Sequence, residues 1–127
     1  MFEASAMGEL EQILPKELTD ATLAAGNEVV LPYVEALKAI VIATRHQIAV
    51  LGLEAFEVRV DGLLTVAMAD ASSHIVFSGD WKAYVATMNA EADRWLRANR
   101  LGQNCGYILT SASESEFTQL KEAAKSR

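Results

Sequence analysis

The fold is decided by the stretch Ala55-Phe56-Glu57-Val58-Arg59-Val60-Asp61-Gly62-Leu63-Leu64-Thr65-Val66-Ala67-Met68-Ala69. Two runs rich in β-branched and aromatic residues flank the pair Asp61-Gly62. This pair favours a type I′ turn, because both central positions of that turn need a positive φ. The pattern therefore predicts a β-hairpin over residues 55–69, with Val60 opposite Leu63.

The two faces of the predicted hairpin differ in character. Phe56, Val58 and Val60 alternate along the first strand and are expected on the core face. On the second face the expected cross-strand pairs are Arg59 with Leu64 and Glu57 with Val66. A mixed face of this kind is either half covered by the rest of the domain or used as a contact surface.

Upstream of the hairpin the spacing of apolar residues predicts helices. The longest is expected over residues 32–51, where the apolar stripe is broad enough for burial on several sides, and Gly52 is expected to end it. Shorter helices are predicted over residues 3–14 and 16–25. The acid-rich residues 1–14 are interpreted as a helical segment open to fraying, and Gly26 as the stop of the second helix.

Downstream of the hairpin, a short strand is predicted near residues 74–77. Asp80 then has the chemistry of an N-cap for a helix over residues 81–100, whose stripe includes Trp81 and whose Asn89 is expected away from the core. A strand is predicted near residues 105–110. Finally, the capping box Ser113-Glu114-Ser115-Glu116 predicts a last helix that buries Phe117 and Leu120.

The expected element order is thus α-α-α-β-β-(β)-α-β-α. This order predicts a helix-rich α+β fold, with a small, mainly antiparallel sheet packed against helices. The 127 residues show no repeat, linker or low-complexity tract, so residues 1–127 are predicted to form a single domain. A chain of this size buries enough surface to fold without a disulfide or a metal.

The composition argues against nucleic acid and membranes as partners and favours a cytoplasmic location. The formal net charge of −6 opposes binding to nucleic acid and to anionic membranes. The longest apolar-rich stretch, residues 31–53, carries too many polar groups for a membrane span. The single cysteine, Cys105, permits no intramolecular disulfide, and the first residues lack the pattern of a secretion signal. We therefore expect a soluble, cytoplasmic protein.

Candidates for catalysis or metal binding are few. Cys105 with His46 or His74 is the one available thiol–base pair, but a lone cysteine is more often a small buried residue. His46 is expected to be a half-buried helix residue, and the two histidines have no metal-binding spacing, so neither a metal site nor a cofactor is predicted. Enzymatic activity is not favoured.

Charged clusters have plain structural explanations. The hairpin acids are more often turn formers and solvated strand ends than a catalytic pair. Arg94, Arg97 and Arg100 recur every third residue, as in an anion site, yet cations near a helix C-terminus favour the helix dipole and form i,i+3 and i,i+4 ion pairs. The structural explanation is therefore favoured over a catalytic pair of acids and over an anion site.

Two functions of different class stay open. The favoured one is a non-enzymatic protein-interaction domain, for example an acidic inhibitor or immunity-type protein for a basic partner, since residues 1–37 hold seven acids against one lysine. Homodimerisation through the long helix or the hairpin is also predicted. The residues expected to bind the partner are Glu54, Glu57, Asp61, Asp70 and Asp80.

The alternative is a small-molecule-binding domain with an aromatic pocket between the sheet and the helix over residues 81–100. The residues expected to line this pocket are Trp81, Tyr84, Trp95 and Tyr107.

Overall fold

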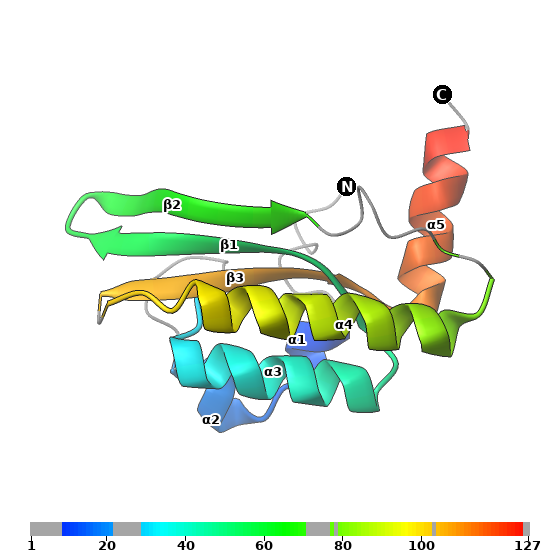
Figure 1. Ribbon diagram of the computed structural model, residues 1–127, viewed down its shortest axis with the longest axis horizontal. Coiled ribbons are helices and arrows are strands. Elements are labelled where there is room, and N and C mark those ends of the chain that lie inside the picture. Colours follow the sequence, from blue (N-terminus) through cyan, green and yellow to red (C-terminus); the bar gives the residue numbers. More distant parts are fainter. Residues whose placement is uncertain (1–8, 22–28, 71–76, 78, 103, 126–127) are drawn as a thin grey trace.

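The computed structural model describes residues 9–21, 29–70, 77, 79–102 and 104–125. It confirms the α+β fold and the predicted element order (Figure 1). The elements are α1 (Glu9–Ile13), α2 (Lys16–Thr19), α3 (Tyr33–Arg45), β1 (Ala49–Arg59), β2 (Gly62–Asp70), α4 (Trp81–Ala98), β3 (Cys105–Ala112) and α5 (Glu114–Lys125).

The three strands form one antiparallel sheet in the order β2-β1-β3. Strand β1 is central, so that Leu53 lies opposite Ala69 on one side and Leu109 on the other. Figure 1 shows α3 and α4 side by side along the part of the sheet away from β2, which runs along the opposite border. The helices thus cover β1 and β3, and β2 extends beyond them as an edge strand.

The hairpin is present, but its predicted register is wrong by two residues at the turn. Val60 and Asp61 form the turn, Arg59 pairs with Gly62, and Val58 pairs with Leu63. Neither turn residue has a positive φ; the positive φ of 136° belongs to Gly62. A type I′ turn needs a positive φ at both of its central residues. In this turn the central residues Val60 and Asp61 have negative φ, and only Gly62, which follows them, has a positive φ.

A β-bulge in β2 then changes which residues share a face. Phe56 pairs with Thr65 and Ala55 with Ala67, which leaves Val66 as the extra residue. Ala55 is fully buried under the helices, and Phe56 is buried as predicted. The predicted core position nearest the turn is wrong, because Val60 lies in the turn itself and is exposed.

The predicted helix over residues 32–51 is wrong in its last third. Helix α3 ends at Arg45, and residues from Ala49 onward belong to β1, so Gly52 lies inside a strand. Between them Gln47 adopts a φ of 59°, the left-handed conformation that stops a helix. The indole nitrogen of Trp81 in α4 donates a 2.7 Å hydrogen bond to the Gln47 carbonyl and fixes this reversal.

Asn89 of α4 holds the same junction from inside the core. The Val50 N–H donates to its Oδ1 over 2.8 Å, and its Nδ2 donates to the Ile48 carbonyl over 3.0 Å and to Thr44 Oγ1 over 2.9 Å. The expectation that Asn89 faces away from the core is therefore wrong. The side chain of Asn89 thus supplies hydrogen-bond partners for the buried main-chain groups of Ile48 and Val50, between the end of α3 and the paired part of β1.

The remaining elements follow the predictions in part. Asp80 caps α4, and the Ser113–Glu116 capping box is formed in both directions, over 3.2 and 2.9 Å. Leu120 is 58% exposed, so its predicted burial is wrong. Gly26 and residues 74–76 of the predicted third strand lie outside the described residues, and Phe77 belongs to no strand.

We predict that Asn89→Ala lowers the free energy of unfolding by about 2–4 kcal/mol, because the Val50 N–H and the Ile48 carbonyl lose their partner inside the core. Urea unfolding followed by circular dichroism measures this loss. The matched control is Arg97→Ala, which removes an exposed ion pair on the same helix and is expected to cost less than about 1 kcal/mol. Equal losses in both variants would contradict the structural role of Asn89.

A second prediction concerns pH. Burial raises the pKa of Tyr107 above 10.0, because the ionised phenol loses its hydration. The unfolded chain therefore ionises first, so the stability present below about pH 10 is lost as the pH rises further. We expect the free energy of unfolding to fall as the pH rises above about 10, and to fall less steeply in Tyr107→Phe. Parallel slopes for the two proteins would contradict the assignment.

Candidate interaction surface

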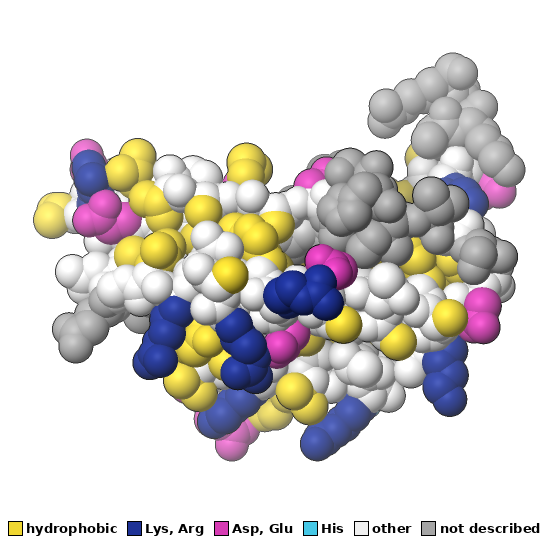
Figure 2. Space-filling model, in the orientation of Figure 1, with side chains coloured by type: hydrophobic (Ala, Val, Ile, Leu, Met, Phe, Trp, Pro, Cys, Tyr) yellow, Lys and Arg dark blue, Asp and Glu magenta, His cyan; other side chains and the backbone are white. Residues whose placement is uncertain are grey.

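Large apolar side chains are exposed mainly on the hairpin. Among the described residues, eight large hydrophobic side chains are exposed, and five of them lie in the turn and in β2: Val60, Leu63, Leu64, Val66 and Met68. Figure 2 shows hydrophobic side chains gathered over the hairpin, with Lys and Arg side chains along the border formed by the helices. We call these five residues the β2 patch.

The β2 patch exists because the strand has apolar residues on both faces and only one neighbouring strand. Register places Leu64 on the face that the helices cover further along the sheet, and Leu63 and Met68 on the opposite face. From Gly62 to Ala69 there is no charged residue and no proline. Natural edge strands usually carry such residues, which prevent pairing with another chain.

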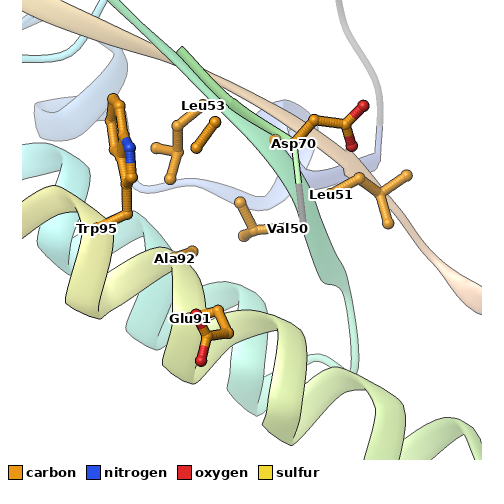
Figure 3. Close-up of a pocket in the computed structure, with 9 residues that line it drawn as sticks. Val50, Leu51, Leu53, Asp70, Glu91, Ala92 and Trp95 are labelled. Atoms are coloured by element: carbon orange, nitrogen blue, oxygen red, sulfur yellow. The ribbon is translucent and has the colours of Figure 1, made fainter. Parts of the chain in front are cut away.

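A small hollow lies between α4 and the two strands of the hairpin (Figure 3). Its volume is about 100 Å³, and its apolar wall includes Leu53, Ala92 and Trp95. In Figure 3 the Trp95 indole stands beside Leu53, while the Asp70 carboxylate points away from α4. Ligand pockets for small organic molecules usually measure about 300–1,000 Å³, so the hollow is too small for one.

Two backbones approach each other closely beside the hollow, at Gly52 of β1 and Ala69 of β2. A Cβ at Gly52 would lie 3.0 Å from the Ala69 carbonyl oxygen, which is closer than side chains normally come to backbone. Glycine at this position therefore allows the end of β2 to stay paired with β1. It keeps the edge strand in place up to Asp70.

Four of the five predicted partner-binding acids surround the β2 patch. Glu54 is paired with Met68, Asp61 lies in the turn, and Asp70 ends β2. Glu57 is next to Leu64 but accepts a 3.0 Å hydrogen bond from Arg59, which offsets its charge. Asp80 lies apart from the hairpin strands and accepts from the Ala83 N–H over 3.2 Å as the cap of α4.

The four aromatic residues of the predicted pocket are divided among three places. Trp81 and Tyr84 pack with Phe77 and Phe117, at centroid distances of 5.3–5.8 Å. Burial, aided by the negative charge of Asp70, raises the pKa of Tyr84.

Tyr107 is buried elsewhere, edge-on to Tyr33, and its hydroxyl donates to the Asn99 carbonyl over 2.7 Å. Trp95 alone lines the hollow beside the hairpin. The structure therefore does not bring the four rings together around one cavity.

The thiol and the described histidine lie at opposite ends of the sheet. Cys105 begins β3 opposite Glu57, whereas His46 precedes the opposite end of β1, where Ala49 pairs with Ala112. The side chain of His46 is exposed, so its predicted half-burial is wrong. His74 lies outside the described residues. Within the described residues no three His, Cys, Asp or Glu side chains converge as metal ligands.

Arg94 and Arg97 of α4, and Arg100 just after it, have partners on α4 or on α3. Arg94 pairs with Glu91, and Arg97 pairs with Asp93 over 2.9 Å. Arg100 lies over the Tyr33 ring, 4.8 Å from its centroid. These contacts are the ordinary ones expected for a solvated helix face.

Sequence reasoning missed the exposure of Val60 and Leu63, which it placed on the core face of the hairpin. Leu63 lies on the face of the sheet that is turned away from the helices, and Val60 lies in the turn itself. The available signal was the run from Gly62 to Ala69, which has none of the charged residues or prolines that usually protect an edge strand.

In the part of the chain that the structure describes, no helix combines the length and the apolar character that crossing a bilayer requires. Comparison of the chain with family models, with curated proteins and with solved structures finds no match.

Proposed function

We propose that this domain is a non-enzymatic protein-interaction module that binds through the outer edge of β2. The observation that carries the proposal is the β2 patch, because its large apolar side chains are exposed on both faces of an edge strand that has no charge from Gly62 to Ala69. An edge strand offers unpaired main-chain N–H and C=O groups, and apolar side chains beside them add the hydrophobic term. Both terms are gained when a protein strand docks there.

The small-molecule alternative has less support. The hollow beside Trp95 measures about 100 Å³, and the rings of Trp81, Tyr84 and Tyr107 are buried in packing of their own. A ligand that buries most of its surface needs several times this volume. A strand or loop of another protein needs no preformed cavity.

Inhibition of a basic partner is a narrower form of the proposal. Glu54, Asp61 and Asp70 lie around the β2 patch, so a partner with basic residues outside an apolar centre would be complementary. Two of the predicted acids have duties within the fold, since Glu57 pairs with Arg59 and Asp80 caps α4. A cytoplasmic location stays a prediction from the sequence.

The proposed function predicts that binding is lost when the edge is charged. The tagged chain, its Val66→Lys variant and a Val41→Lys control are each used to capture proteins from the native cell. Val66 is 46% exposed on β2 and Val41 is 50% exposed on α3, so both variants should fold, as circular dichroism can confirm. We expect Val66→Lys to reduce the recovered partner by about tenfold or more, and Val41→Lys to leave it unchanged.

The proposal is contradicted if the chain and Val66→Lys recover the same proteins in equal amounts. Loss of binding in Val41→Lys alone would instead place the interface on α3.

A further inference from the structure

We infer that the partner of the β2 edge is a second copy of this chain, and that two β2 strands pair antiparallel to form one six-stranded sheet. This inference rests on the proposed function and names its partner. The two-fold axis passes near Val66, the middle of β2, and stands perpendicular to the sheet.

The first argument is the contrast between the two edges of the sheet. On the β3 edge, Leu31 exchanges two 2.8 Å backbone hydrogen bonds with Tyr107 and so occupies part of that edge. On the β2 side, the described residues include no further strand. Of the two edges, β2 is thus the one suited to strand addition.

The second argument is that β2 is complementary to itself. A two-fold axis perpendicular to the sheet keeps the helix-covered face of both copies on the same side. Because the bulge shifts the faces, the matching register places Leu63 opposite the partner's Met68 and Leu64 opposite the partner's Ala67. Apolar residues then meet apolar residues on both faces, and a partner strand of any other sequence would need the same two-sided pattern.

The third argument is the distribution of charge. Since Gly62 to Ala69 carry no charge, no like charges face each other along the paired strands. At the ends, Asp61 of one copy approaches Asp70 of the other, and each chain has a net charge of −6. Electrostatics therefore oppose the dimer weakly, while apolar contact and main-chain pairing favour it.

The proposed interface between the two copies is small, so we expect weak binding. Nine residues of β2 from each copy take part, compared with about 20–30 residues on each side of a standard interface. A dissociation constant on the order of micromolar is therefore expected.

Cysteine cross-linking tests the register. In a Cys105→Ser background, Leu63→Cys/Met68→Cys places two thiol pairs across the interface, whereas positions 63 and 68 of one strand lie about 16 Å apart. Mild oxidation should convert the double variant into a disulfide-linked dimer at least about tenfold faster than either single variant. Equal rates for the double and single variants would overturn the register.

Salt distinguishes a second copy from a basic partner. Light scattering of the purified chain should show dimer at about 100 μM, with a larger dimer fraction at about 0.5 M salt than at about 0.05 M, because salt screens the acidic ends. The Val66→Lys variant should be monomeric under both conditions. A monomer mass for the unaltered chain throughout would overturn self-pairing, while loss of captured partners in Val66→Lys would still support the proposed function.

Discussion

The structure depends on the way Asn89 and Trp81 of α4 hold the junction between α3 and β1. Their side chains bind the backbone of Gln47, Ile48 and Val50, where the chain changes from helix to strand. Since β1 is the central strand, this junction positions the whole sheet relative to α3 and α4. A single amide and a single indole thus fix the start of the central strand next to α4.

The same arrangement explains why β2 is exposed. Because Asn89 binds the start of β1, α4 packs along β1. Its Trp95 lies beside Leu53 of β1, at the hollow between α4 and the hairpin. Ala67 reaches the core, whereas Leu63 and Met68 do not. An apolar edge strand is costly in water, because its large side chains stay exposed and, among the described residues, its outer side pairs with no further strand. Pairing with another strand removes both costs, so the exposed edge follows from the fold and suits binding.

The sequence predicts those parts of the fold that depend on local signals. The Asp80 cap, the Ser113–Glu116 capping box and the existence of the hairpin depend on neighbouring residues and are confirmed. The end of α3 was missed because the apolar period of residues 32–51 suits a helix, and the reversal at Gln47 is fixed by α4, far along the chain. The acidic residues near the β2 patch could be proposed from the sequence as partner-binding residues. The exposure of β2 could not be predicted in the same way, since it depends on where the helices end and on the strand register, which turns Leu63 and Met68 to the other face of the sheet.

The most direct measurement of the central claim is amide hydrogen exchange of β2 at two protein concentrations, about 5 μM and about 500 μM. Strand pairing between copies engages the outward-facing amides of Gly62–Asp70, so their exchange should slow at the higher concentration. Amides inside α4 should exchange at the same rate in both samples, since they are already bonded within the helix. Exchange of the β2 amides that is independent of concentration would contradict the account.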